Sequence, residues 1–394
     1  MAPIFFRNVQ GSATHAFVIG VGGYGDAKFG RGAKPELRKV KDLPSAADSA
    51  RFMVDWLIAN QDALAAPLAS IHLLISDPGV VTADQKRYNW VNPFPFSGAS
   101  SANVKLEGQS WIASLTKRVG DVAFFYACGH GAGLSTQPVL FLDDLNSDPI
   151  NPWAHHNIGV TASSFKQLAA IKTGFFFTDT CREFIPKFEL GSAQDLSRFA
   201  PPFDPFGNTG TDKISLLCGT TDTQLSYEGQ TASDPAVRLG RFTQMLSKAL
   251  DGVSCRRRGT QWTVHPGAIF EDLKIISRLY RPDWRKEAFE PSLPMLANEV
   301  FPIIYPPNPK VPVVVYTDPE EEAKNFYLRI FNNSSRQTPW LAERESRGPG
   351  AWLAEIPASL MPHYAVAAAE DPTVFHQEIF VPNAPNFDQR ISVR

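Results

Sequence analysis

Short apolar segments alternate with amphipathic segments over the first 300 residues of the chain. The apolar segments have the length of strands and lie at 15–20, 71–76, 121–129, 174–179 and 213–219. Other segments carry apolar residues at helical spacing, at 45–60, 111–119, 161–170, 240–250 and 266–280. Strands that are apolar on both faces are typical of a parallel sheet covered by helices. The pattern therefore predicts an α/β fold with a mostly parallel central sheet and helices on both faces.

The pattern changes near residue 300. Residues 301–312 are rich in proline and predict a connector. Beyond this connector, short strand-like runs are separated by turn residues, a spacing that is typical of small all-β domains. We therefore expect one domain over 1–300, a linker over 301–312, and a small β-rich, sandwich-like domain over 313–394.

The composition is that of a globular protein without a strong charge bias. Hydrophobic residues make up 43% of the chain, charged residues make up 20%, and the net charge is −2. A chain this close to neutral does not attract nucleic acid or an anionic membrane by its overall field, so we expect neither as a partner. The N-terminal apolar run is too short for a signal peptide, and no segment has about 18 consecutive apolar residues. We expect a cytoplasmic protein.

The cysteines favour a reducing compartment. They are widely spaced, without a C-x-x-C pair, at Cys128, Cys181, Cys218 and Cys255. This spacing argues against a disulfide framework and against a zinc site. No cluster of aspartates indicates a calcium site. We therefore expect no bound metal.

A glycine-rich stretch ends the first predicted strand. Gly20–Gly25 matches the string G-x-G-x-x-G of dinucleotide-binding loops. In those loops a helix begins directly at the glycines, because its N-terminal N–H groups hold the pyrophosphate. Here the stretch after Gly25 contains glycine, proline and many charges, and the first amphipathic segment begins near Ser45. A dinucleotide-dependent oxidoreductase is therefore a weak alternative.

Two predicted strands end in residues that can carry chemistry. His130 directly follows one strand and lies between two glycines, while Cys181 comes two residues after Asp179 at the end of another. Parallel strands bring their carboxyl ends to one edge of the sheet, where open α/β folds build their sites. A cysteine nucleophile needs an imidazole that takes its proton and later protonates the leaving amine. The backbone N–H groups of Gly131 and Cys181 are candidates for an oxyanion hole.

These motifs resemble those of the caspase-like cysteine peptidases, the group of caspases, metacaspases and their bacterial relatives. His130 in "GHG" and Cys181 in "DTC" are 51 residues apart, close to the caspase spacing of about 50. Further segments match the family in the same order, at 15–26, 43–57, 218–229 and 240–250. The resemblance covers about residues 13–285 and implies a caspase-like fold. It also implies peptide-bond hydrolysis by a Cys181–His130 dyad, without a metal or organic cofactor.

The resemblance further implies a preference for basic residues in a protein or peptide substrate. Glu228 stands where caspases have an arginine that binds aspartate, and Asp179 matches an acidic pocket residue of metacaspases. Asp48 matches a second acidic residue on the helix 45–60. Such carboxylates would bind a guanidinium or an ammonium group, so we expect cleavage after Arg or Lys. Two simpler interpretations stay open: Asp48 as a first-turn helix acid, and Glu228 as a solvated loop residue.

Regulation and partners are also suggested by the resemblance. The segment 181–207 lies where related peptidases carry a loop that is cleaved during activation, and Lys187 or Arg198 would suit self-processing by a basic-specific enzyme. Bacterial relatives often act in stress, cell-death or defence signalling. The domain 313–394 would then dock a regulatory protein. The alternative from another class is a catalytically silent caspase-like scaffold that binds partners.

Overall fold

The computed structural model divides the chain into two compact units. It describes residues 3–25, 27, 35–77, 97–134, 137–181, 194–201, 212–221, 226–231, 237–281, 289–333, 339–344, 347–348, 350–370, 375–383 and 389–392. The first unit comprises Met1–Ser247 and Lys286–Ile303, and the second comprises Lys248–Arg285 and Ile304–Arg394. This division differs from the expected boundaries at 300 and 312, because residues 248–285 group with the C-terminal part of the chain.

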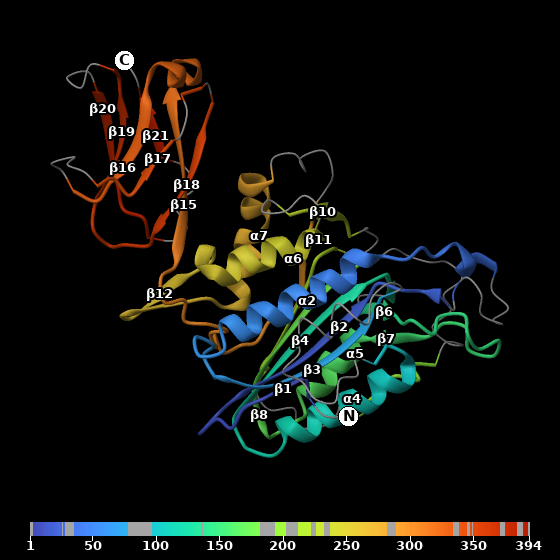
Figure 1. The fold of residues 1–394 in the computed structure, drawn as a ribbon. Helices are drawn as coiled ribbons and strands as arrows, with labels where there is room; N and C mark the ends of the chain where they lie inside the picture. The colour runs from blue at the N-terminus through green and yellow to red at the C-terminus, as the bar shows by residue number, and fades with distance from the viewer. Residues whose placement is uncertain are drawn as a thin grey trace. The chain divides into compact units, whose positions relative to one another are not determined.

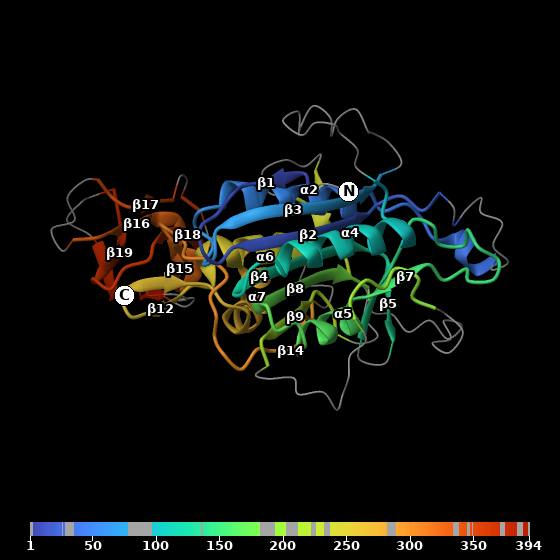
Figure 2. The ribbon, with the colours of Figure 1, turned by 90° about the horizontal axis from the view of Figure 1, so that it is seen from below.

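The first unit is built on a seven-stranded sheet with the strand order β1-β3-β2-β4-β8-β9-β14 (Figure 1, Figure 2). The bounds are β1 Phe5–Phe6, β2 Thr14–Val21, β3 Leu68–Ser76, β4 Asp121–Gly129, β8 Ile171–Thr180, β9 Ile214–Cys218 and β14 Ser292–Met295. The neighbours β3, β2, β4, β8 and β9 pair in parallel, whereas the edge strands β1 and β14 are antiparallel to their neighbours. This mostly parallel sheet confirms the predicted α/β fold.

Helices cover both faces of the sheet. Their bounds are α2 Pro44–Ala59, α4 Ser101–Leu115, α5 Ile158–Phe165 and α6 Arg241–Lys248. Figure 1 shows α2 and α6 on one face, and α4 and α5 on the other. α2 approaches β2 closely, because a Cβ on Gly20 would lie 2.6 Å from the Cβ of Ala50. On the other face, Trp111 of α4 is fully buried and its ring lies 5.5 Å from that of Phe17. In the described part of the chain, no helix is long and apolar enough to cross a membrane.

Smaller elements extend the first unit beyond the sheet. They are η1 Pro35–Lys39, the three-stranded sheet of β5 Gly131–Leu134, β6 Gln137–Phe141 and β7 His155–Asn157, and the pair β10 Glu228–Gln230 and β11 Arg238–Gly240. β5 begins directly after His130, and β10 begins at Glu228. Both small sheets therefore start at residues of the predicted site.

The second unit contains the expected β-rich region. Its elements are η2 Ala249–Val253, β12 Arg256–Arg258, β13 Gln261–Thr263, α7 Pro266–Tyr280, β15 Lys310–Asp318, η4 Glu320–Asn325, β16 Tyr327–Phe331, β17 Ala342–Glu343, β18 Trp352–Pro357, β19 His363–Ala368, β20 Phe375–Phe380 and β21 Gln389–Ser392. The sheets β18-β15-β21 and β17-β16-β19-β20 are antiparallel except for the pair β15–β21. Val313 and Ile356 of the first sheet share one apolar core with Leu328 and Ala365 of the second. Two sheets that face a common core form a sandwich.

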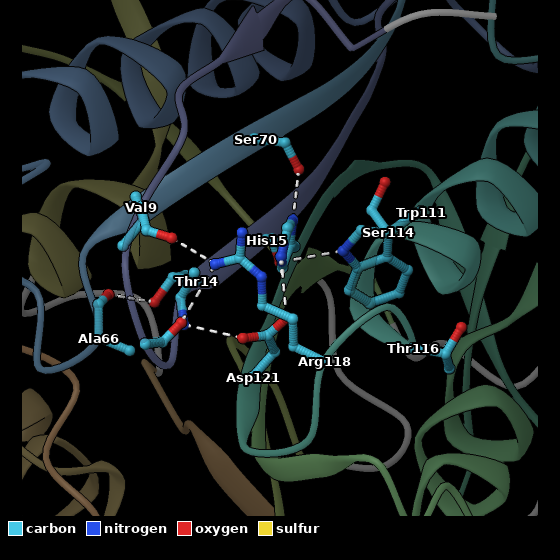
Figure 3. Close-up of polar contacts among 12 residues, drawn as sticks. Val9, Thr14, His15, Ala66, Ser70, Trp111, Ser114, Thr116, Arg118 and Asp121 are labelled. Atoms are coloured by element: carbon cyan, nitrogen blue, oxygen red, sulfur yellow. Dashed lines mark hydrogen bonds and ion pairs between the residues drawn. The ribbon is translucent and has the colours of Figure 1, made fainter.

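A buried polar cluster joins the beginnings of three neighbouring strands (Figure 3). The Nδ1 of His15 lies 2.7 Å from the Ser70 hydroxyl oxygen, and its Nε2 lies 3.3 Å from a carboxylate oxygen of Asp121. The order serine, histidine, aspartate is that of a hydrolase triad. The three residues are only 1%, 7% and 0% exposed, and they lie at the amino ends of the strands, opposite the edge where open α/β folds build their sites. We therefore assign the cluster to structure: it ties β2, β3 and β4 together at their amino ends.

Candidate active site

The strand register brings His130 and Cys181 to the same point of the sheet edge. β4 and β8 pair in parallel, with Cys128 opposite Asp179 and Gly129 opposite Thr180. His130 and Cys181 are the next residues of the two strands. A Cβ on Gly131 would lie 2.9 Å from the backbone oxygen of Cys181, so the chain after His130 runs directly along the Cys181 backbone. The expectation that parallel strand ends would bring these two residues together is therefore met.

Two hydrogen bonds orient His130, one made by its ring and one made by its backbone. Its Nε2 lies 2.9 Å from the carbonyl oxygen of Lys41, and its backbone N–H donates to the Tyr24 hydroxyl at 2.9 Å. A carbonyl oxygen only accepts, so Nε2 carries the hydrogen and Nδ1 of the neutral ring keeps its lone pair. Burial lowers the pKa of His130 below 6.5, although the Lys41 carbonyl and the charge of Glu228 oppose this effect. A neutral imidazole with a free lone pair is suited to accept a thiol proton.

The amides of the glycine-rich loop are used within the chain. The N–H groups of Gly22 and Gly23 donate to the Ser76 carbonyl at 2.7 and 2.8 Å. The N–H of Tyr24 donates to the Asp42 carboxylate at 3.0 Å. A dinucleotide loop would direct such groups at a pyrophosphate. The loop thus positions Tyr24, which contacts His130. Because these N–H groups are bonded within the chain, they are not directed at a pyrophosphate, which argues against a dinucleotide site.

Cys181 differs from the other cysteines in its exposure. Cys128, Cys218 and Cys255 are buried, and burial raises the pKa of the Cys255 thiol to about 12. Cys181 is only partly buried. Its Sγ accepts the backbone N–H of Ser226 at 3.3 Å and lies 3.8 Å from the Ser226 carbonyl oxygen. Because a nucleophile needs both access and a polar environment, Cys181 is the cysteine suited to that role.

Gly131 is confined by neighbouring backbone. A Cβ there would collide with the Val139 carbonyl oxygen as well as approach Cys181, so only glycine fits this position. The close approach explains why a glycine follows His130. The oxyanion-hole role of the Gly131 and Cys181 N–H groups stays a prediction.

Asp179 is a buried carboxylate beside the nucleophile. Its Oδ1 accepts the Ser226 hydroxyl at 2.5 Å, and its Oδ2 accepts the Thr243 N–H at 3.0 Å and the Thr243 hydroxyl at 2.7 Å. A Cβ on Gly240 would collide with this carboxylate, so the glycine makes room for it. Burial raises the pKa of Asp179 above 3.8, while these hydrogen bonds oppose the effect. Among the described residues no lysine or arginine pairs with Asp179, so its charge has no cationic partner there.

Asp48 has a different environment. Its carboxylate pairs with Arg51 at 2.9 Å, and Arg51 also pairs with Asp77 at 2.9 Å. The fully buried Ser49 of α2 approaches the Asp179 region, where its hydroxyl accepts the N–H of Gly240 at 2.9 Å. A pocket role for Asp48 would therefore require Arg51 to give up its partner.

Glu228 lies near His130 but also has a cationic partner. Its carboxylate pairs with Arg238 at 2.8 Å, with 29% and 56% of the two side chains exposed. Its negative charge acts to raise the pKa of His130, so the two side chains are electrostatically coupled. Glu228 is thus at the rim of the site, in a solvent-screened ion pair.

Of the two expected self-cleavage positions, Lys187 lies outside the described residues. Arg198 lies between Ser197 and Phe199, which are 0% and 8% exposed. Phe199 packs against Trp111 in the core, with ring centroids 6.2 Å apart. A protease must hold its substrate in an extended form, so cleavage after Arg198 requires local unfolding first.

A cavity of about 540 Å³ lies elsewhere in the first unit. Its walls include Ser163 of α5, Leu216 of β9 and Met295 of β14. None of the predicted site residues is among the described residues that line it. The candidate active site at the sheet edge is therefore separate from this cavity.

The sequence reasoning missed the groups that hold the site together. Ser226 and Thr243 bind Asp179, and the Lys41 carbonyl and Tyr24 bind His130. Ser226 precedes Glu228 in the compared loop, so its position offered a signal. A backbone carbonyl such as that of Lys41 leaves no signal in the sequence.

No family model matches the sequence, and no curated protein is significantly similar to it. Among solved structures, the crystal structure of protein GSU0716 from Geobacter sulfurreducens is similar with a TM-score of 0.42 and 13% identity. The match covers 75% of this chain and 98% of that chain.

Proposed function

We propose that the chain is a cysteine endopeptidase of caspase-like type that cleaves peptide bonds after Arg or Lys. The observation that carries the proposal is the meeting of three groups at one sheet edge. They are an accessible thiol at Cys181, an imidazole with a free Nδ1 at His130, and the buried Asp179 carboxylate. The carboxylate supports basic specificity because no cation of the described chain neutralises it.

The reaction follows from the roles of these groups. The Cys181 thiol gives its proton to His130 Nδ1, and the sulfur attacks the scissile carbonyl carbon. The resulting oxyanion accepts hydrogen bonds from the Gly131 and Cys181 N–H groups. The C–N bond then breaks, the amine takes the proton from His130, and a thioester remains. A water molecule gives a proton to His130 and attacks the thioester carbonyl carbon. The C–S bond then breaks, the acid is released, and the Cys181 thiolate takes the proton back from His130.

A peptide panel with a covalent probe tests this function. The peptides differ only in the residue before the scissile bond, which is Arg, Lys, Asp or Leu. The probe is a peptide that ends in Arg and carries a thiol-reactive group. We expect cleavage after Arg and Lys, and labelling of Cys181 that is lost in Cys181→Ala but kept in the buried-cysteine control Cys255→Ala.

The same experiment judges the alternatives. Cleavage only after Asp would contradict the assigned specificity. A folded protein that is neither labelled nor cleaves any peptide would support the catalytically silent scaffold. Docking of a regulatory protein on 313–394 stays a prediction that this panel does not address.

A further inference from the structure

We propose that Ser226 couples the binding of a cationic substrate side chain at Asp179 to the reactivity of Cys181, so that a basic substrate side chain releases the nucleophile that cleaves it. The inference rests on the proposed function for the chemistry of the occupant, a guanidinium or an ammonium group. Ser226 is a positioning residue in this scheme, because it acts through Asp179 and Cys181.

The contacts of Ser226 join the two functional groups. Its side-chain hydroxyl donates to Asp179 Oδ1 at 2.5 Å. Its backbone N–H donates to Cys181 Sγ at 3.3 Å, and its carbonyl oxygen lies 3.8 Å from the same sulfur. A single residue therefore spans the carboxylate and the nucleophile. A change at its hydroxyl is transmitted to its own backbone without an intermediate residue.

A basic side chain competes with Ser226 for one carboxylate oxygen. Oδ2 of Asp179 is held by the N–H and the hydroxyl of Thr243, which is part of α6. Oδ1 is held by the hydroxyl of Ser226, beside Gly219, which has no side chain. A guanidinium binds a carboxylate best through two parallel N–H···O bonds to both oxygens, and its positive charge adds an attraction that the neutral Ser226 hydroxyl lacks. The incoming cation therefore displaces the Ser226 hydroxyl from Oδ1.

Displacement changes the state of the sulfur. Without a cation at Asp179, the sulfur is held by the Ser226 N–H, which stabilises the thiolate and lowers its nucleophilicity. When the hydroxyl leaves Asp179, Ser226 loses its side-chain anchor, and the contact of its N–H with Sγ weakens. The thiol pKa then rises and the intrinsic reactivity of the thiolate increases. Substrates without a basic residue leave the sulfur in its held state.

Alkylation of Cys181 by iodoacetamide tests this coupling, since the reagent is small and neutral. The cation used to bind Asp179 is methylguanidinium at millimolar concentration, with N-methylurea as the uncharged control. We expect methylguanidinium to accelerate alkylation at alkaline pH by roughly two- to tenfold, the equivalent of one hydrogen bond. We expect N-methylurea to have no effect. The pH profile of alkylation should also shift to higher pH with methylguanidinium, which a merely structural role of Ser226 would not cause.

Variants separate coupling from folding. Ser226→Ala should alkylate faster than the wild type without the cation and should no longer respond to it. Ser226→Thr keeps the hydroxyl and should keep the response. Ser110→Ala removes a hydroxyl from the exposed side of α4 and should behave as the wild type. Thermal unfolding of each variant confirms that the measured protein is folded.

Three results would overturn the coupling: an equal response of Ser226→Ala and the wild type, slower alkylation with methylguanidinium in both, or no effect of the cation on alkylation. The coupling and the peptidase activity fail separately. Cleavage of Arg peptides with no cation effect on alkylation contradicts the coupling and leaves the peptidase in place. A cation effect without cleavage of any peptide supports the coupling and contradicts the peptidase.

Discussion

At the scale of single residues, the candidate site depends on backbone groups as much as on side chains. The Lys41 carbonyl determines that the ring hydrogen of neutral His130 is on Nε2, and the Ser226 N–H contacts the sulfur of Cys181. These backbone groups remain when the side chain of their residue is replaced. Substitution of the side chains that carry the proposed chemistry, such as His130 and Asp179, is therefore the informative test.

For His130 we expect activity to extend to lower pH than an ordinary imidazole allows. Burial lowers its pKa below 6.5, and the ring must be neutral to take the thiol proton, so the acid limb of kcat/KM should lie below pH 6.5. A pH–rate profile with an Arg peptide measures this limb. His130→Ala should reduce kcat/KM by about 10²- to 10⁴-fold. An acid limb above pH 6.5 would contradict the assigned role.

Asp179 and Asp48 form a matched pair for testing specificity. Asp179→Asn removes the buried charge, so kcat/KM for Arg peptides should fall by about 10- to 100-fold, the loss of a charged hydrogen bond. Asp48→Asn removes a carboxylate that already pairs with Arg51 and should change the same constant by less than about threefold. Steady-state kinetics on Arg and Leu peptides measures both effects. A larger loss in Asp48→Asn than in Asp179→Asn would reverse the assignment.

The sequence predicted the residues at the strand ends but not all of their partners. His130, Cys181 and Asp179 follow apolar runs whose parallel pairing is a general rule, so their meeting was foreseeable. The ion pair between Asp48 and Arg51 was not foreseeable. Arg51 lies one helical turn away, and exposed acids at this spacing form such pairs in some helices and not in others. The local sequence pattern predicts the position of a side chain on its helix or strand. It does not predict which residues that side chain contacts.

At the scale of elements, α4 shows why a helix can be missed. The sequence predicts a helix over 111–119, whereas α4 begins at Ser101 and ends at Leu115. Its buried face includes Glu107, which pairs with His72 at 2.6 Å, and Gly108, which lies under Phe199. A polar residue and a glycine on the buried face hide the helical periodicity that apolar residues would show.

The contact between α2 and β2 gives a stability prediction. Gly20→Ala places a Cβ 2.6 Å from that of Ala50, so the helix must shift and the free energy of unfolding should fall by about 1–3 kcal/mol. Gly25→Ala is the matched control, because its Cβ would meet nothing within 4 Å. Urea unfolding of both variants measures the difference. Equal stabilities would show that the α2–β2 contact is looser than described.

At the scale of the whole molecule, buried histidines make stability depend on pH. His156 is fully buried, with its Nδ1 2.8 Å from the Ser197 hydroxyl, and burial lowers its pKa to about 4. The folded chain keeps His156 neutral, while the unfolded chain binds a proton below about pH 6.5. Its contribution is therefore fully present above pH 6.5 and is lost as the pH falls toward 4, by about 3 kcal/mol.

Urea unfolding at a series of pH values measures this loss. His156→Asn should be less stable at neutral pH but should show a flatter dependence between pH 6.5 and 4. His15, whose pKa is also lowered by burial, adds a slope of the same sign. An unchanged slope in His156→Asn would place the acid sensitivity in other groups.

The composition of the second unit limits how the chain can be shortened or recombined. Glu355 of β18 accepts the Tyr280 hydroxyl at 2.6 Å and the Lys248 ammonium at 3.0 Å, and a Cβ on Gly252 would lie 2.8 Å from Pro309. A chain that ends at residue 300 keeps Lys248 and Tyr280 but lacks Glu355 and Pro309. We expect this truncated chain to aggregate on expression, whereas the full chain stays monodisperse in size-exclusion chromatography. The β-sandwich consequently cannot be exchanged between homologous proteins on its own. A chimera must include residues 248–285 together with the sandwich.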